Sequence, residues 1–248
     1  MPLRTGYNPK ALITTFLIIL LLYVSWVASP TCFLWKLLDD RCFFFLNSLL
    51  GRGTAHQNFW AFANHRMMDW IHDLSMTCFF LFYIFKGPKK LKLYRTGEFL
   101  FTIALFATTI VLINKTLIQD NYKILRDSPS LKYPFCYRLS ELVDWIYVKD
   151  YSRCSFPSDH GTTATLFTGA IFIVMGWRPG MLALLYGIFF SLPRLVVGAH
   201  WLTDVLIGSM TITLPMLALG YFTPLCKLFS IGFDKLFQRK EPYEPRQL

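Results

Sequence analysis

The chain has 248 residues, of which 54% are hydrophobic, 17% are aromatic and only 16% are charged. An average soluble domain carries roughly 25% charged residues, so this chain cannot cover a globule of its size with a charged surface. The same composition excludes intrinsic disorder and a Gly- or Pro-rich fibre, which leaves an integral membrane protein. The formal net charge of +10 would suggest a nucleic-acid partner in a soluble protein, so the placement of the charges must decide.

Six apolar runs predict six membrane-spanning helices, because a helix needs about 20 residues to cross about 30 Å of hydrocarbon. The first run, Ala11–Trp35, carries no charge and holds a span before Pro30, and the last run, Val205–Cys226, holds another. Any one of the four shorter runs between them could be a buried helix of a soluble protein, but six in one chain of low charge favour a membrane. We expect spans at about residues 11–28, 69–86, 98–116, 161–177, 179–194 and 203–224, all within a single domain of residues 1–248.

The segment Thr31–Leu50, between the first and second predicted spans, has a different pattern. It mixes a run of phenylalanines with four charged side chains, Lys36, Asp39, Asp40 and Arg41. Such a mixture is typical of an amphipathic helix that lies in the membrane interface rather than across it. The predicted fold is therefore an all-α integral membrane bundle of six transmembrane helices plus one amphipathic interfacial helix.

Lysine and arginine residues set the predicted orientation, because short cytoplasmic loops of membrane proteins carry an excess of both. If both termini are cytoplasmic, the cytoplasmic segments carry these cations about twice as densely as the opposite side. The basic loop Lys86–Arg95 is the strongest marker, and a membrane-flanking loop is a far commoner explanation of it than a nucleic-acid site. We therefore expect cytoplasmic termini, with residues 115–160 and 194–203 on the outer side.

Three polar stretches lie on that outer side, and the first is Phe156–Gly161 at the start of the fourth predicted span. The first amides of a helix have no helical partner and lie at the positive end of its dipole, so together with Ser158 they suit an anion. Taken alone, the pair Ser158-Asp159 is better explained by an ordinary helix N-cap.

The second stretch, Pro193–Asp204, places His200 and Asp204 four residues apart. On a helix these two side chains meet on one face, and a carboxylate bonded to an imidazole prepares it as a base or nucleophile. Two alternatives stay open at this point. A His–Asp pair can be purely structural, or it can bind a metal, for which only Cys154 and Asp159 are further donors nearby.

The third stretch runs from Lys115 to Pro129 and includes Lys123 and Arg126. Ionisable groups at membrane depth are expensive and usually functional, which makes these cations candidate ligands for an anion. Cations at the end of a span are also common interfacial anchors, and this alternative explains Lys115 and Lys132.

Together the three stretches resemble the motifs of the type 2 phosphatidic acid phosphatase superfamily, whose members are integral membrane lipid phosphatases. The superfamily pattern is Lys-x6-Arg-Pro, then Pro-Ser-Gly-His, then Ser-Arg-x5-His-x3-Asp. Here the second motif reads Pro157-Ser158-Asp159-His160 and the third reads Pro193-Arg194-x5-His200-x3-Asp204. The third motif matches at its arginine, histidine and aspartate with the family spacing.

The chain departs from this pattern in its first two motifs. Asp159 stands where glycine is usual in the second motif. In the first motif Arg126 is followed by Ser128-Pro129, and Gln119 stands where lysine is usual. Two residues, Lys123 and Lys115, are therefore alternatives for the lysine of that motif.

From about Arg126 to Pro224 the chain further resembles one branch, the lipid A 1-diphosphate synthases of Gram-negative inner membranes. The matching runs include Ser152-Arg153-x-Ser155-Phe156-Pro157 and Gly198-Ala199-His200-Trp201. An aspartate before the histidine of the second motif is expected in that branch, so Asp159 fits it, whereas Ser158 departs from its usual glycine.

The resemblance implies a mechanism in which His200 attacks phosphorus and forms a phosphohistidine, while Asp204 positions and polarises its ring. It implies His160 as the general acid for the departing oxygen and then as the base for the acceptor. The implied phosphate-binding residues are Arg194, Arg126, Lys123, Ser158, Gly161 and Arg153. No metal or other cofactor is expected, because charge and positioning can stabilise a loose phosphoryl transition state.

The acceptor decides which reaction the resemblance implies. A phosphotransferase would move a phosphoryl group from undecaprenyl diphosphate to lipid A 1-phosphate, on the periplasmic face of the bacterial inner membrane. With water as the acceptor, the same site would be a lipid phosphatase that hydrolyses undecaprenyl diphosphate or another lipid phosphate. A non-catalytic membrane protein that binds lipid is a further alternative. In each case the implied partners are membrane lipids and not nucleic acid.

The remaining histidines and cysteines match no motif. Surface or interface positions are expected for His56, His65 and His72. Asn64 and the pair His65-Arg66 could help to shape the lipid site. Four cysteines fall on the predicted outer side, where disulfides can form, so bridges Cys136–Cys154 and Cys32–Cys42 are a hypothesis.

Overall fold

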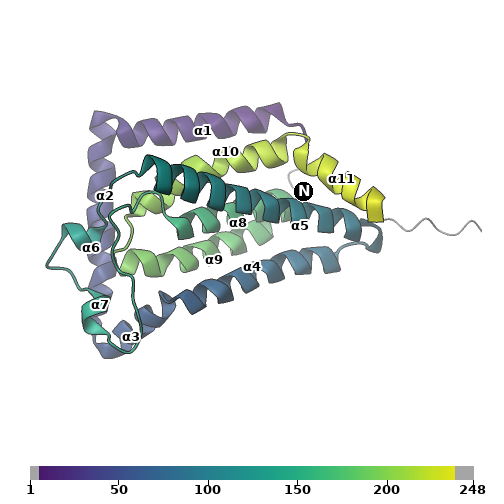
Figure 1. Cartoon of the computed structure of the whole chain (residues 1–248). Coiled ribbons are helices and arrows are strands. Elements are labelled where there is room, and N and C mark those ends of the chain that lie inside the picture. The colour runs from purple at the N-terminus through teal and green to yellow at the C-terminus, as the bar shows by residue number, and fades with distance from the viewer. Residues whose placement is uncertain (1–5, 238–248) are drawn as a thin grey trace, which may run out of the picture.

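The computed structural model describes residues 6–237, and every regular element in that range is a helix. Figure 1 shows long helices running side by side as a bundle, with one helix crossing its end. The long helices are α1 (Pro9–Val27), α4 (Arg66–Lys86), α5 (Lys92–Ala107) continued by η3 (Thr108–Tyr122), α8 (Asp159–Met175), α9 (Trp177–Val196), and η4 (Asp204–Gly208) continued by α10 (Ser209–Phe222). The predicted all-α class is confirmed.

Each predicted span coincides with one long helix of the described chain. The largest difference is in the third, where the helical stretch Lys92–Tyr122 extends beyond the predicted residues 98–116 at both ends. Four stretches are long and apolar enough to cross a membrane, namely Pro9–Val27, Lys89–Tyr122, Trp177–Val196 and Asp204–Phe222. The other two helices are α4, which has three charged residues in its first eight positions, and α8, which has 17 residues. Six spans therefore stay a prediction.

The helix ends follow from local sequence. Asn8 begins α1 by accepting a hydrogen bond from the Ala11 amide at 3.1 Å, and Pro9 occupies the first helical position, where it needs no N–H partner. The helix α4 ends at Gly87-Pro88, since proline disfavours a helical conformation in the residue before it. Gly176 separates α8 from α9 with a positive φ of 90°, which only glycine adopts readily.

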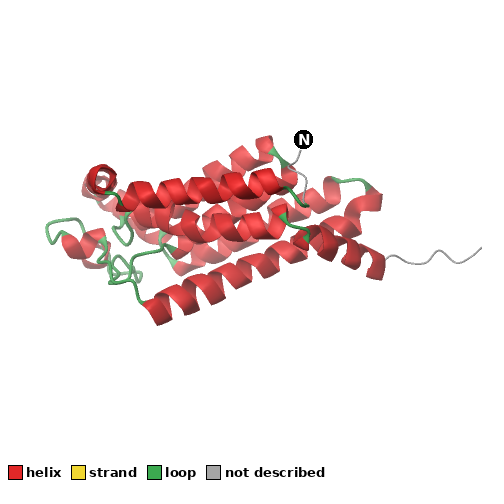
Figure 2. Ribbon diagram, turned by 90° about the horizontal axis from the view of Figure 1, so that it is seen from above, coloured by secondary structure: helices red, strands yellow, loops and turns green. Residues whose placement is uncertain are grey.

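The helix α8 packs along α9 and α10, within the bundle of long helices that is also seen from above in Figure 2. Its side chains Phe167 and Ile171 are fully buried and join a core with Phe80 of α4 and Leu217 and Tyr221 of α10. The helix α1 packs on the outside of α10 and has no buried residue, although its sequence is almost entirely apolar. Such an exposed apolar helix is stable in hydrocarbon rather than in water, which fits a membrane protein.

A cap, formed by the crossing helix and several short helices, covers one end of the bundle (Figure 1). It consists of α2 (Ser29–Asn47), η1 (Ser48–Arg52), α3 (Thr54–Ala63), α6 (Pro129–Lys132) and α7 (Leu139–Leu142). The helix predicted over Thr31–Leu50 is observed as α2, and it buries Asp39, Phe43 and Asn47 along one stripe. Because these three residues are four apart, they lie on one face of α2. This face packs against the bundle, where α2 contacts α9.

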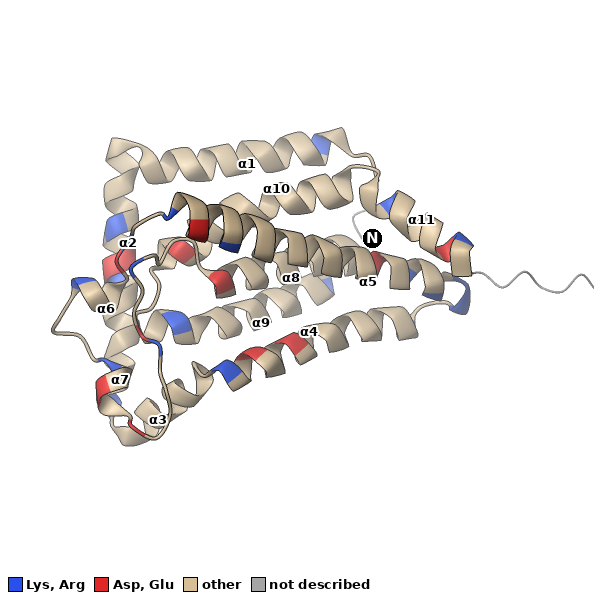
Figure 3. Ribbon diagram, in the orientation of Figure 1, with Lys and Arg blue, Asp and Glu red and all other residues tan. Residues whose placement is uncertain are grey.

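The two ends of the described chain lie together at the opposite end of the bundle, away from the cap (Figure 1). The Gly6 amide donates to the Tyr221 carbonyl at 2.9 Å, and α11 (Leu225–Phe237) packs against α5. We expected this last segment only as a cytoplasmic tail. Figure 3 shows that Lys, Arg, Asp and Glu gather towards the two ends and leave the middle of the bundle nearly uncharged. Which end faces the cytoplasm stays a prediction.

All six cysteines lie within residues 6–237, and all are free thiols. The hypothesised bridges Cys136–Cys154 and Cys32–Cys42 are therefore not formed in this structure. Cys226 is buried at the start of α11, and the other five are intermediate or exposed.

The contact between α5 and α11 generates a prediction about stability. A methyl group added at Gly97 in α5 would lie 2.9 Å from the Ser230 Cα atom of α11, whereas one added at Gly232 would meet no atom within 4 Å. Gly97→Ala should lower the free energy of unfolding by about 1–3 kcal/mol, because backbone cannot move aside. Gly232→Ala, the matched control, should leave it unchanged or raise it by up to about 1 kcal/mol. Denaturant unfolding in detergent measures both, and equal effects would contradict the packing.

Candidate active site

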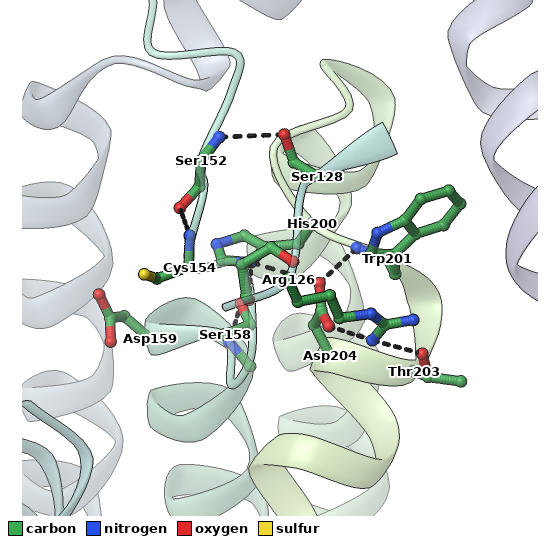
Figure 4. Close-up of polar contacts among 12 residues, drawn as sticks. Arg126, Ser128, Ser152, Cys154, Ser158, Asp159, His200, Trp201, Thr203 and Asp204 are labelled. Carbon is green, nitrogen blue, oxygen red and sulfur yellow. Dashed lines mark hydrogen bonds and ion pairs between the residues drawn. The ribbon is translucent and has the colours of Figure 1, made fainter. Parts of the chain in front are cut away.

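The motif residues meet where the bundle joins the cap. Two outer loops run side by side there, because the Arg126 amide donates to the Arg153 carbonyl at 3.0 Å and the Ser128 amide donates to the Ser152 carbonyl at 2.9 Å. The Ser152 amide also donates to the Ser128 hydroxyl at 3.0 Å (Figure 4). These bonds fix both loops above the start of α8.

His200 lies in a turn between α9 and η4, and not inside a helix. The turn depends on Gly198, which has a φ of 76° and whose added Cβ would meet Phe43 at 2.8 Å. The His200 Nδ1 atom lies 2.7 Å from the Ser155 carbonyl and 3.8 Å from the Asp204 carboxylate. A carbonyl only accepts, so Nδ1 carries the proton and the lone pair is on Nε2. The backbone of Ser155, rather than Asp204, is thus the direct hydrogen-bond partner of the ring.

The fully buried carboxylate of Asp204 has other direct partners. It accepts a hydrogen bond from the Trp201 amide at 2.7 Å and forms an ion pair with Arg126. Arg126 also pairs with Asp39 of α2 at 2.8 Å, and Thr203 donates to Asp39 from both its amide and its hydroxyl. Burial raises the pKa of the Asp39 carboxyl above its ordinary value, although the Thr203 hydrogen bonds and the Arg126 charge oppose this. One guanidinium therefore joins α2 to the segment that follows His200.

His160, in the first turn of α8, has partners from two other helices. Its Nε2 atom lies 3.0 Å from the Asp69 carboxylate of α4 and 2.7 Å from the Arg194 guanidinium of α9. Arg194 also contacts Asp69 at 3.2 Å and donates to the Asn64 carbonyl at 2.8 Å. The ring nitrogen can accept from Arg194 when it is unprotonated and donate to Asp69 when it is protonated, so both charge states have a partner.

Both motif histidines line one polar cavity of about 350 Å³. Arg194 lies on its wall, as do Asp159 and residues of the outer loops. The other polar lining residues are Gln119, Asp120, Lys149, Tyr151, Ser152 and Cys154. A cavity with two imidazoles and a guanidinium can bind a phosphoryl group and exchange protons with it.

The other predicted phosphate-binding residues do not reach this cavity. Arg126 turns its guanidinium towards Asp204 and Thr203 (Figure 4), and Lys123 and Arg153 are exposed outside the cavity lining. The Ser158 hydroxyl accepts from the Gly161 amide at 3.2 Å, which is the ordinary N-cap considered from the sequence. Lys115, the alternative to Lys123, is also exposed and outside the lining. Of the six predicted ligands, Arg194 alone lies on the cavity wall within the described chain.

Two of the departures from the family motifs, Gln119 and Asp159, contact each other. The Gln119 side-chain amide donates to the Asp159 carboxylate at 2.7 Å, and the Asn114 amide donates to the same oxygen at 2.6 Å. Gln119 occupies the position of the usual lysine and Asp159 that of the usual glycine. The pair forms one wall of the cavity, so the usual cation is absent from that wall.

Some residues of the site lie outside the three family motifs. Asp69 and Asp39 were not predicted, although a carboxylate in an otherwise apolar span is expensive unless it is paired, which is a signal for Asp69. Asn64 was considered as a residue that shapes the site, and its carbonyl and side-chain oxygens both accept from Arg194. His72 is buried and bonds to Tyr186 at 2.7 Å, so it is a core residue rather than a surface one.

Within residues 6–237, no group of three or more His, Cys, Asp or Glu side chains is arranged to hold a metal ion. The alternative of a metal pair at His200 and Asp204 therefore finds no third protein ligand in the described part of the chain.

A family model and one known protein match the sequence of the chain. The model of the PAP2 superfamily matches residues 99–223, which include both histidines, Arg194 and Asp204. The chain is 31% identical over 226 residues to a lipid A 1-diphosphate synthase from Escherichia coli (strain K12). The aligned region covers 90% of this chain and 92% of that protein. No solved structure gives a significant match.

The family model spans half of the chain, and the relative is similar over nearly its whole length. The apolar helices indicate a membrane protein. The family and the relative together support membrane lipids as its partners. The chain therefore belongs to the PAP2 superfamily and is an enzyme of the PAP2 type, with lipid phosphatase or phosphotransferase activity.

Proposed function

We propose that the protein transfers a phosphoryl group from undecaprenyl diphosphate to lipid A 1-phosphate through a phosphohistidine, on the periplasmic face of the bacterial inner membrane. The observation that carries this proposal is that His200, His160 and Arg194 line the same polar cavity. The choice of lipids rests on the similarity to a lipid A 1-diphosphate synthase over 90% of the chain.

His200 is the proposed nucleophile. Its Nδ1–H is held by the Ser155 carbonyl, so the Nε2 lone pair is free to form the N–P bond. The P–O bond to the donor lipid breaks as the N–P bond forms, and the leaving oxygen takes a proton from His160. In the second step an oxygen of the acceptor attacks phosphorus, His160 receives any proton that it loses, and the N–P bond breaks.

Asp69 is the proposed positioning residue for His160. Because it binds Nε2–H, it leaves Nδ1 of the imidazolium to donate to the leaving oxygen, as a carboxylate does in a catalytic dyad. Once His160 is protonated, its contact with Arg194 joins two donors and becomes repulsive. Phosphoryl oxygens then offer the guanidinium a better partner, and its planar fork can bind two of them.

An apolar cavity supports a lipid substrate. It measures about 380 Å³, is lined mainly by apolar side chains of α8, α9 and α10, and reaches Gly161, the residue after His160. A hydrocarbon chain in this cavity would place its phosphate headgroup close to the histidines. Hydrolysis remains the second candidate, because the steps up to the phosphohistidine are the same for both reactions.

The fate of the phosphate distinguishes the two candidates. We expect purified protein, given undecaprenyl diphosphate labelled in its terminal phosphate, to pass the label to lipid A when lipid A is present. His200→Ala should form neither labelled lipid A nor free phosphate, because no N–P bond can form, whereas His56→Ala outside the site should behave as wild type. Thin-layer chromatography of the products measures both. Label appearing only as free phosphate in the presence of lipid A would reject transfer in favour of hydrolysis.

The role of Asp69 is tested with two substrates. Asp69→Asn should lower kcat on a lipid phosphate by roughly 10- to 100-fold, because general acid catalysis contributes about that much or more. With an aryl phosphate that has an acidic phenol as its leaving group, the loss should shrink, since that oxygen needs no proton. Asp73→Asn, one helical turn further along α4 and exposed, is the matched control and should keep full activity. Equal losses on both substrates would show that Asp69 is merely structural.

A further inference from the structure

The cavity lacks positive charge for its proposed substrate. A diphosphate or phosphohistidine carries at least two negative charges, and such groups are bound by several cations at once. Arg194 contributes one cation, but the Asp69 carboxylate lies 3.2 Å from it and offsets much of its charge. Asp120 and Asp159 add two carboxylates to the lining. A second cation is therefore needed for an anion to enter.

One further lysine or arginine lines this cavity, and it is Lys149 on the loop before Tyr151. Its ammonium forms no ion pair with any residue of the described range, so it is available to a ligand. Its side chain is exposed, while its neighbours Val148 and Asp150 are buried. This alternation fixes which residue of the loop is directed outward.

The backbone at Lys149 is tied to the catalytic groups. The Asn64 side-chain amide donates to the Lys149 carbonyl at 3.2 Å, and the oxygens of the same Asn64 accept from Arg194. Asn64 therefore connects the Lys149 backbone directly to the Arg194 guanidinium. The next residue, Asp150, is held by Arg138 at 3.1 Å and by the Ser140 amide and hydroxyl at 3.0 and 2.8 Å. The loop is thus fixed at the lysine backbone and at the residue that follows it.

We propose that Lys149 is a phosphate-binding residue of this site and replaces the lysine of the first family motif, at whose position this chain has Gln119. The inference rests on the proposed function and extends it, because it names the group that binds the anionic part of the lipid substrate. Gln119 replaces the motif lysine on one wall of the cavity and is bonded to Asp159 there. Lys149 supplies the cation from the loop instead, next to Arg194.

The charges of the lining support this assignment. The cavity lining holds two cations, Lys149 and Arg194, and two carboxylates, Asp120 and Asp159. With neutral histidines, removal of Lys149 leaves one more negative than positive group around the phosphate. Like charges in a partly enclosed cavity repel strongly, because water screens them less than at a free surface.

Binding of inorganic phosphate to the purified full-length protein, measured by calorimetry, tests the proposal without relying on turnover. Lys149→Ala should raise the Kd at least about tenfold, as expected for loss of a charged hydrogen-bonding partner. Lys149→Arg keeps the charge and should stay within about threefold of wild type. Lys132→Ala is the matched control, because this lysine lies in the same outer region but pairs with Asp40 at 3.7 Å, outside the cavity.

The same variants in the labelled-lipid assay separate this inference from the proposed function. If the wild type binds phosphate through Lys149 but neither transfers nor hydrolyses lipid phosphate, the proposed function fails and the assignment of Lys149 stands. If the wild type is active while Lys149→Ala keeps its phosphate affinity and its kcat/KM, the assignment is overturned. A tenfold weaker phosphate affinity in Lys123→Ala, with Lys149→Ala unchanged, would overturn it as well. A wild type that binds no phosphate would overturn the assignment of Lys149, and the labelled-lipid assay alone would then decide the proposed function.

Discussion

The guanidinium of Arg126, held between two buried carboxylates, is the interaction on which the geometry of the site depends. Asp39 comes from α2 in the cap and Asp204 from the segment after His200, so the ion pairs join elements that are far apart in the chain. The exposed fractions of the two carboxylate side chains are 4% and 0%. Neither could stay ionised there without a partner, because desolvating a lone carboxylate is very costly. Arg126 thereby fixes the turn that carries His200.

Each histidine of the cavity is oriented by a different kind of partner, and each partner suits the ring to a different proposed role. His200 is held by a backbone carbonyl, which leaves its other nitrogen with a lone pair and suits a nucleophile. His160 is held by the Asp69 carboxylate, which stabilises the protonated ring and suits a general acid. Arg194 lies against His160 and Asp69, so the proposed proton donor and the guanidinium are adjacent on the cavity wall.

The sequence predicted the helices well and the site in part, for physical reasons that particular residues illustrate. Apolar runs and helix caps are local, so the long helices and the N-cap at Ser158 could be foreseen. The motif spacing predicted His160, Arg194 and His200 as candidates, and the structure brings the three side chains to one cavity. Asp39, Asp69 and Lys149 could not be placed, since their roles depend on which distant elements the fold brings together. For the same reason Arg126 was expected in the cavity, whereas the structure turns it towards Asp39 and Asp204.

The stability of Arg126 variants, measured by thermal unfolding of the purified protein, tests most directly whether this residue holds the site together. Arg126→Gln should lower the Tm by roughly 5–10 °C, because about 3 kcal/mol is lost when one partner of a buried ion pair is removed. Adding Asp39→Asn to the same chain should restore part of that loss, since it removes one of the two uncompensated carboxylates. An unchanged Tm in Arg126→Gln, accompanied by a weaker affinity for phosphate, would instead make Arg126 a substrate ligand and contradict its structural role.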